Sequence, residues 1–273
     1  MGALDGRIAI VTGASRGIGK GCARELAEAG ATVYVTGRTV APGQATLPGT
    51  VGQTVHEIEA AGGKAIAVAC DHAADEQVQA LFERVRKEQG GLDVLVNSAF
   101  ADPGIENSPP FWETPLAWYD TLCDAGTRGA YVASALAVPL MLERKAGLIV
   151  NVSSLGAGFF FQHVAYGMGK AALDKLTSDA GRQLRKLDVC VVSIWPYFVK
   201  TEAVMALKAA GSAIPLEGAE SQRFVGRGVN ALAADPDRMK RTGKVFTSRE
   251  LADDYGFTDV DGRLPTGSTL PRR

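Results

Sequence analysis

Residues 7–19 read RIAIVTGASRGIG, an aliphatic run followed by a glycine-rich turn and the start of a helical pattern. Such a turn needs glycine because the chain must bend sharply, approach a pyrophosphate with its backbone and pack the helix closely on the strand. The helix that follows presents free N–H groups and a positive dipole end to an anion. The stretch therefore predicts a dinucleotide-binding unit, whose expected cofactor contacts are Gly13, Ser15, Arg16, Gly17, Ile18 and Gly19.

The rest of the chain alternates short β-rich runs with longer amphipathic segments. Strands separated by helices of this length imply right-handed crossovers and a sheet covered on both faces. The sequence thus predicts an α/β fold with a doubly wound, mostly parallel sheet and helices on both faces. The expected strands are residues 7–11, 31–35, 64–69, 92–96, 148–152, 189–194 and a weaker 243–247, and the expected helices are residues 17–29, 76–89, 116–144 and 166–187.

Two stretches rich in proline and glycine interrupt this alternation. Residues 39–54 and 101–115 are expected to be long loops that leave from the carboxyl ends of strands, where ligands bind in doubly wound sheets. Both are candidates to border the site, although ordinary surface elaboration explains the first equally well. The length of 273 residues fits a single domain, residues 1–273, with a C-terminal extension from about residue 250.

The composition excludes several classes of protein. Lys and Arg total 29 against 30 for Asp and Glu, which argues against nucleic acid or an acidic membrane as the main partner. The longest apolar stretch, residues 130–142, is too short to span a bilayer, and the sequence starts with no basic and apolar leader. The 4 cysteines are scattered, as in reduced cytosolic proteins, and no His or Cys cluster has metal-binding spacing. We expect a cytoplasmic protein with no membrane span and no metal.

The residues after the second expected strand bear on the choice of nucleotide. An acidic residue there would bind the ribose 2′-hydroxyl of NAD, but the chain continues with Gly37 and Arg38. Together with Arg16, Arg38 offers the charge and the forked donors that suit a 2′-phosphate. The sequence thus favours NADP(H), with two solvated surface arginines as the alternative interpretation. Asp71, after the third strand, is expected to accept from the adenine amino group, to cap a helix, or both.

Tyr166-Gly-Met-Gly-Lys170 places a phenol and an ammonium four residues apart on an expected helix, and therefore on one face. A nearby buried cation favours the phenolate and lowers the tyrosine pKa from its ordinary value of about 10. Such a tyrosine can protonate a carbonyl oxygen as hydride reaches the carbon, or accept the proton of an alcohol in reverse. Ser153 and Ser154, at the end of the preceding strand, offer a hydroxyl for the same oxygen.

Together these motifs resemble the short-chain dehydrogenase/reductase family, in its compact single-domain branch, from about residue 6 to residue 245. The resemblance implies a Rossmann-like seven-stranded sheet and hydride transfer between a nicotinamide and a carbonyl or alcohol. It makes Tyr166 the acid/base, Ser154 the residue that positions the carbonyl, and Lys170 the group that binds the nicotinamide ribose and tunes Tyr166. The family motif selects Ser154, although Ser153 gives the commoner spacing to Tyr166. The resemblance rests on residues 12–19, Asn97-Ser-Ala99, the set Ser154, Tyr166 and Lys170, and residues 196–201.

The same resemblance implies further cofactor contacts. Asn97 would lie near the adenosine ribose and stabilise the central strands. Val199 would meet the nicotinamide carboxamide through its backbone, and Thr201 would lie on the pyrophosphate side. Ala99 and Pro196 belong to the same two motifs and complete the expected cofactor site. The long helices of this family pair between subunits, which implies a homodimer or a homotetramer.

Three positions depart from the family's usual pattern. Phe100 replaces the last glycine of an NNAG motif, and Tyr197 replaces the glycine of a Pro-Gly pair. Gly126 stands where relatives usually have an asparagine, which holds a water that links the lysine to solvent. Without that amide, proton relay needs another water partner or runs more slowly. Gly126 and the late motifs at residues 253–256 and 259–262 are similar to one branch, which is associated with NADPH-dependent reduction of apolar carbonyl compounds.

Aromatic residues are concentrated in the expected loops at the strand ends, as in an apolar small-molecule site. We expect a small apolar ketone, aldehyde or secondary alcohol as substrate, although core packing and subunit contact explain about half of these residues equally well. His163 is expected at the surface or against substrate. Two alternatives to a carbonyl reductase stay open: a non-catalytic NADP(H)-binding regulatory protein, and an enoyl thioester reductase, against which the Tyr166–Lys170 pair argues. The aromatic residues are Phe100, Phe111, Trp112, Phe159, Phe160, Phe161, Trp195, Tyr197 and Phe198.

Overall fold

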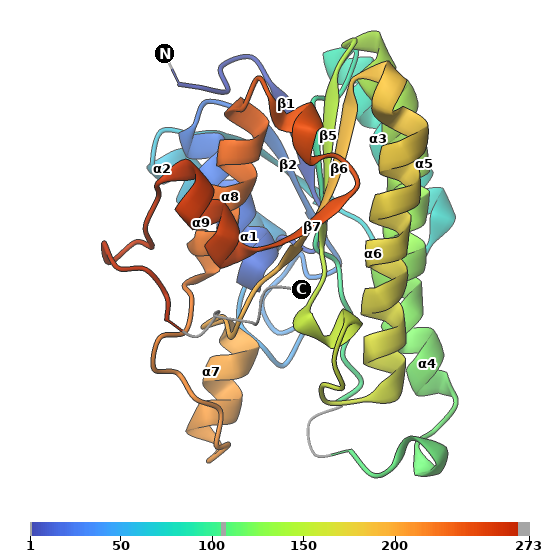
Figure 1. The fold of residues 1–273 in the computed structure, drawn as a ribbon, viewed down its shortest axis with the longest axis vertical. Helices are drawn as coiled ribbons and strands as arrows, with labels where there is room; N and C mark the ends of the chain where they lie inside the picture. The colour runs from blue at the N-terminus through green and yellow to red at the C-terminus, as the bar shows by residue number, and fades with distance from the viewer. Residues whose placement is uncertain (1, 105–107, 267–273) are drawn as a thin grey trace.

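A parallel seven-stranded sheet in the order β3-β2-β1-β4-β5-β6-β7 runs through the centre of the molecule (Figure 1). The computed structural model describes residues 2–104 and 108–266. This order confirms the predicted Rossmann-like, doubly wound fold. The strands are β1 Ile8–Val11, β2 Thr32–Gly37, β3 Lys64–Ala69, β4 Val94–Asn97, β5 Gly147–Val152, β6 Val189–Trp195 and β7 Lys244–Thr247.

Helices cover both faces of this sheet, as Figure 1 shows. One layer contains α1 Gly17–Glu28, α2 Val51–Ala60, α8 Gln222–Ala234 and α9 Ser248–Tyr255. The other contains α3 Asp75–Gln89, α5 Gly129–Glu143 and α6 Val164–Leu184, with α4 Ala117–Leu122 beside the lower part of α6. Helix α7 Glu202–Ala209 lies below the first layer, on the side of the sheet where the strands end.

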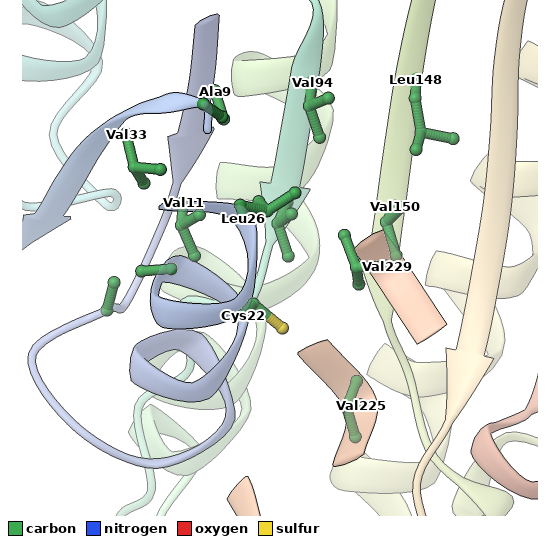
Figure 2. Close-up of a cluster of buried hydrophobic side chains, with 14 of the residues drawn as sticks. Ala9, Val11, Cys22, Leu26, Val33, Val94, Leu148, Val150, Val225 and Val229 are labelled. Carbon is green, nitrogen blue, oxygen red and sulfur yellow. The ribbon is translucent and has the colours of Figure 1, made fainter. Parts of the chain in front are cut away.

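Two apolar cores hold the three layers together. On one side Leu26 of α1 and Val229 of α8 pack against strand residues such as Val150, as Figure 2 shows. The second core joins α3 and α5 to the opposite face of the same strands. All four residues of β1 are buried because a central parallel strand is covered on both faces, which is why residues 8–11 read as a continuous aliphatic run.

The structure corrects two of the expected elements. The loop expected over residues 39–54 ends at Thr50, whose side chain accepts from the Gln53 N–H at 3.0 Å and caps α2. The helix expected over residues 116–144 is divided, since a π-helical turn at Cys123–Arg128 separates α4 from α5. Residues 105–107 of the expected 101–115 loop and residues 267–273 of the expected C-terminal extension lie outside the described residues.

The strand order places a reversal of direction between β1 and β4. The chain winds outward from β1 to β3 on one side and from β4 to β7 on the other, so the crevice for a ligand lies where the carboxyl ends of β1 and β4 meet. Within the described part of the chain, no helix has the length and apolar character that a membrane crossing requires.

Candidate active site

The glycine turn after β1 interlocks with the segment after β4. Gly13 has a φ of +65°, and a Cβ there would lie only 2.7 Å from the Ala99 Cα, so a side chain is excluded. Thr12 fixes the contact from the other side, because its hydroxyl oxygen accepts the N–H groups of Ser98 and Ala99 at 2.9 Å each. The backbones of two predicted cofactor segments, the glycine turn after β1 and the segment after β4, are thus in direct contact.

The first turn of α1 binds an anionic group. The Gly17 N–H donates to Oε2 of Glu202 at 2.8 Å, and Glu202 opens α7. A carboxylate is stabilised there by the helix dipole and by the free N–H groups of the first turn. Thr201 lies beside the same turn and caps α7 by accepting from the Val204 N–H at 3.2 Å. The predicted residues Gly17 and Thr201 therefore meet at an anion-binding helix end.

The two predicted arginines differ in their surroundings. Arg16 donates to the carbonyl oxygens of Pro48 at 2.9 Å and Gly49 at 2.8 Å, and so fastens the 39–50 loop over the glycine turn. Arg38 is exposed at the end of β2. Arg16 also donates to the hydroxyl of Thr39, the residue after Arg38, at 3.2 Å. Burial lowers the pKa of Arg16, Glu202 raises it, and the positive charge of Arg38 lowers it. The structure therefore brings both arginines to one edge of the crevice, with Arg16 already bonded to protein.

Asp71 forms a local turn after β3. Its Oδ1 accepts from the Ala73 N–H at 3.0 Å, while the N-cap residue of α3 is Ala74. Asp71 is therefore not the helix cap that one of its two interpretations required. The neighbouring His72 is buried, its Nε2 lies 2.8 Å from the Thr36 hydroxyl, and burial lowers its pKa to about 4.

Asn97 ties the central strands together. Its Nδ2 donates to Oδ1 of Asn151 on β5 at 2.8 Å and to the Ser134 hydroxyl on α5 at 3.1 Å. Asn151 continues the network by donating to Thr177 on α6 at 2.9 Å. These contacts match the strand-stabilising role that was expected of Asn97. The remaining predicted cofactor residues follow the ends of two strands: Ser15, Ile18 and Gly19 in the β1–α1 unit, and Pro196 and Val199 after β6.

The two adjacent serines have different partners. Ser153 donates its hydroxyl to the Lys170 carbonyl oxygen of α6 at 3.1 Å, so it fastens the helix to the end of β5. Ser154 accepts from the Gly156 N–H at 3.1 Å and forms a side-chain hydrogen bond with Tyr166. Only Ser154 of this pair shares a hydrogen bond with the phenol.

Tyr166 is packed against backbone. A Cβ at Gly156 would lie 2.8 Å from Cε1 of the phenol ring, so the 155–157 turn fits closely around it. Burial raises the pKa of Tyr166, and the hydrogen bond from Ser154 opposes that shift. This differs from the expected lowering by Lys170, because the ammonium lies 5.6 Å from the ring centroid and loss of solvent around the phenol dominates.

Lys170 lies behind the phenol at the end of β5. Its Nζ donates to the Val152 carbonyl oxygen at 3.0 Å, and burial lowers its pKa to about 8, which Asp174 opposes. Asp174 follows one helical turn later and accepts from the Ser193 hydroxyl at 2.7 Å and the Trp195 Nε1–H at 2.9 Å. A lysine with this pKa changes charge readily near neutral pH.

Phe100 lies beside both Gly126 and Lys170. A Cβ at Gly126 would meet Cδ2 of Phe100 at 3.9 Å, and the Phe100 ring centroid lies 5.1 Å from the Lys170 Nζ. The same ring packs edge-on against Tyr166, with 5.7 Å between centroids. Two of the departures from the family pattern, Phe100 and Gly126, are therefore neighbours beside Lys170.

Other aromatic side chains extend this apolar wall. Phe161 lies 6.2 Å from Tyr166 and 6.0 Å from Phe198 between ring centroids, and Phe198 packs on Tyr197 at 5.1 Å. His163 is buried rather than a surface group, because it caps α6 by accepting from the Ala165 N–H at 3.2 Å. The Tyr166 ring thus contacts the phenyl rings of Phe100 and Phe161. Phe111, Trp112, Phe159 and Phe160, also among the expected aromatics, are exposed.

This arrangement fits a dinucleotide and a carbonyl compound. The glycine turn excludes side chains, the α1 N-terminus already binds an anionic oxygen, and the two arginines lie at the far edge. The serine hydroxyl, phenol and ammonium then lie between the carboxyl end of β5 and the first two turns of α6. The set can hold an oxygen atom, exchange a proton with it, and keep water away from it.

Comparison with known proteins agrees with this arrangement. The family model for short chain dehydrogenases matches residues 7–211, and the chain belongs to the short-chain dehydrogenase/reductase family of oxidoreductases. It is 41% identical to Dehydrogenase/reductase SDR family member 1 of Homo sapiens, over 95% of this chain and 85% of that protein. It is 31% identical to Hydroxysteroid dehydrogenase-like protein 2 of Xenopus tropicalis, over 95% of this chain and 61% of that protein. The predicted resemblance to this family, and to the branch that contains Dehydrogenase/reductase SDR family member 1, is confirmed.

Solved structures agree as well. A short chain dehydrogenase of Mycobacterium thermoresistibile superposes with a TM-score of 0.82 at 26% identity, covering 97% of this chain and 92% of that chain. A metagenomic short-chain oxidoreductase in complex with NADP gives 0.71 at 31% identity, covering 86% of this chain and 94% of that chain.

Three carboxylates near the site were not among the expected residues. The sequence could have indicated Asp174, because Asp174 follows Lys170 by one helical turn and lies on the same face of the helix. The sequence contains no such indication for Glu202, the first residue of α7, or for the buried Glu220, since each meets its partner only through the tertiary fold.

Proposed function

We propose that this protein is an NADP(H)-dependent oxidoreductase that acts on an apolar carbonyl compound or the corresponding secondary alcohol. The observation that carries the proposal is the set Ser154, Tyr166 and Lys170, gathered at the carboxyl end of β5 beside a wall of phenyl rings. The cofactor supplies or accepts the hydride at the carbonyl carbon.

The three polar groups have separate roles in the proposal. Tyr166 holds its proton at neutral pH because burial raises its pKa, so in the reductive direction it donates that proton to the carbonyl oxygen. Ser154 shares a hydrogen bond with the phenol and holds the same oxygen. Lys170 binds the nicotinamide ribose and supplies positive charge as the phenolate forms.

The preference for NADP(H) rests on the β2 end. Arg38 is exposed there, and an acidic residue that would bind a free 2′-hydroxyl is replaced by Gly37. Gly17 would hold the pyrophosphate at the α1 N-terminus, and Asn97, Val199 and Thr201 would contact the rest of the nucleotide. The relative solved with NADP supports this choice of nucleotide.

The substrate class rests on the wall around Tyr166. Phe100, Phe161 and Phe198 present aromatic rings to the phenol or to one another, and such a lining favours an apolar carbonyl compound. Exposed apolar side chains on the α4–α5 side, Leu116 and Tyr131 among them, support the further proposal of a homodimer or homotetramer.

A carbonyl panel with NADPH tests the reaction. We expect turnover of apolar ketones or aldehydes, and a loss of about 10²–10⁴-fold in kcat for Tyr166→Phe with NADPH affinity retained. Tyr131→Phe is the matched control, because Tyr131 is 62% exposed on α5. Unchanged turnover in Tyr166→Phe would show that the phenol is not the acid/base.

One observation favours a second candidate, a non-catalytic NADP(H)-binding regulatory protein. Phe100 covers the side of Lys170 on which Gly126 replaces the usual amide. NADPH binding without turnover on the whole panel would select this alternative. Reduction of an enoyl thioester, with no turnover of any ketone or aldehyde, would identify the protein as an enoyl thioester reductase.

A further inference from the structure

The backbone after β6 is fastened by one residue. Glu220 accepts the Tyr197 N–H through Oε1 at 3.0 Å, donates its own N–H to the Phe198 carbonyl oxygen at 2.8 Å, and accepts the Lys200 N–H through its carbonyl at 2.9 Å. A parallel bridge between Val199 and Glu220 completes this short ladder. Side chain and main chain of Glu220 therefore fix the whole segment that the proposed function assigns to the nicotinamide end.

Glu220 is unusual among the carboxylates near the site because none of its side chain is exposed. Its Oε1 also accepts from the Ser248 hydroxyl at 2.5 Å, while Oε2 has no hydrogen-bond partner among the described residues. Burial raises its pKa to about 7. A buried carboxyl with one oxygen unsatisfied costs folding free energy. Stabilisation of the fold alone does not require a fully buried carboxyl group with an unsatisfied oxygen.

A second carboxylate holds Glu220 in place from the C-terminal side. Asp259 accepts from the Ser221 N–H at 2.7 Å and from the Ser221 hydroxyl at 2.5 Å. Arg227 of α8 donates to the Asp259 carbonyl oxygen at 3.1 Å, so the C-terminal segment is itself anchored. These residues all follow residue 211, where the match to the family model ends.

We propose that Glu220 is a positioning residue, which presents the 197–200 backbone to the nicotinamide end of the cofactor, and that Asp259 and Ser248 hold it there. This inference rests on the proposed function. Glu220 bonds to backbone and to Ser248 and acts through Tyr197, Phe198 and Lys200, so it is not itself a catalytic residue. It gives the late motif at residues 259–262 a function in the site.

The test compares Glu220→Ala with Glu220→Gln and with Glu217→Gln, an exposed glutamate on the same connection. For Glu220→Ala we expect NADPH affinity to fall about fivefold, the effect of one lost hydrogen bond. Affinity for 2′,5′-ADP, which lacks the nicotinamide, should change by less than about twofold. Glu220→Gln should restore most of the NADPH affinity, because its amide oxygen can accept from the same two donors.

Limited trypsin digestion of the protein without nucleotide gives a second readout. Lys200 is exposed, and Glu220→Ala should raise the rate of cleavage after it about fivefold over wild type and Glu217→Gln. If Glu220→Ala fails to fold, Ser248→Ala removes one donor to Oε1 and should shift both measurements in the same direction. Since digestion needs no nucleotide, it separates this inference from the proposed function, which fails alone if wild type binds no nicotinamide nucleotide.

Two results would overturn the inference. Equal losses of NADPH and 2′,5′-ADP affinity in Glu220→Ala, without rescue by Gln, would show that Glu220 only supports the fold. Wild-type behaviour of both Glu220→Ala and Ser248→Ala would show that the 197–200 backbone holds its place without them.

Discussion

Arg38→Ala is the sharpest test of the nucleotide preference. Arg38 is exposed at the end of β2, so its removal leaves neither a cavity nor a buried group without a partner. Any loss of affinity then reports on contacts with the nucleotide. A hydrogen bond to a charged group contributes about 1.5–3 kcal/mol, and solvent exposure moves this pair to the low end of that range. We therefore expect NADPH affinity to fall about tenfold and NADH affinity to change by less than about twofold.

Arg16→Ala is the natural comparison. Its guanidinium is bonded to the carbonyl oxygens of Pro48 and Gly49, so its loss releases the 39–50 loop. This change should lower the affinity for NADPH and for NADH to a similar degree. The assay is fluorescence titration of each variant with NADPH and NADH at two salt concentrations. The Arg38 effect should shrink at high salt, because an exposed charge pair is screened.

The opposite pattern would refute the reasoning. Equal weakening of NADPH and NADH by Arg38→Ala would mean that Arg38 supports the adenosine end without contacting a 2′-phosphate. A loss of NADPH affinity without a loss of NADH affinity in Arg16→Ala would mean that the bonds between Arg16 and the 39–50 loop break when the nucleotide binds.

Three further changes have defined outcomes. Ser154→Ala should lower kcat about 10²-fold while Ser153→Ala, which loses bonds to the Lys170 carbonyl and to Asp174 but none to the phenol, keeps kcat within about threefold, as steady-state kinetics would measure; the reverse order would transfer the role to Ser153. Glu202→Gln should tighten NADPH binding about two- to fivefold in fluorescence titration, because the Gly17 N–H then binds a neutral group that the pyrophosphate displaces more easily; weaker binding would contradict that exchange. The pKa of Glu220 is raised from 4.5 to about 7, so its protonated form stabilises the fold at low pH and this stability is lost as pH rises through 7. Glu220→Gln should therefore gain about 3 kcal/mol relative to wild type between pH 4 and pH 8 in denaturant unfolding, and a pH-independent difference would show that the carboxyl does not titrate there.

Much of the fold could be predicted because each buried strand forms a local run of aliphatic residues that the sequence shows by itself. The strand Lys64–Ala69 was predicted to the residue, and β1 was recognised because both of its faces are buried. Helix α2 was missed because residues 39–54 contain prolines and glycines up to the cap at Thr50, and Gly52 lies within its first turn. The break at Cys123–Arg128 was missed because a π-helical turn keeps the helical spacing of side chains closely enough to hide it.

The site could be predicted where a motif is local in sequence. Tyr166 and Lys170 share one helix, so their spacing alone places them on one face. The choice between Ser153 and Ser154 needed the structure, since only the tertiary fold shows which hydroxyl meets the phenol. Glu220 could not be found from spacing, because its partners are twenty or more residues away along the chain.

The clamp formed by Glu220, Ser248 and Asp259 also affects how the protein is made. A chain that leaves the ribosome from its N-terminus presents the glycine turn early, whereas Ser248 and Asp259 emerge only after β7. Helix α1 packs on α8, so the end of the crevice at the glycine turn is complete only once residues 222–234 have emerged, and the 197–200 backbone is fixed later still. We expect a chain shortened before Ser248 to lack the bonds by which Ser248 and Asp259 hold Glu220 and its neighbour Ser221, and therefore to leave the 197–200 backbone unfixed.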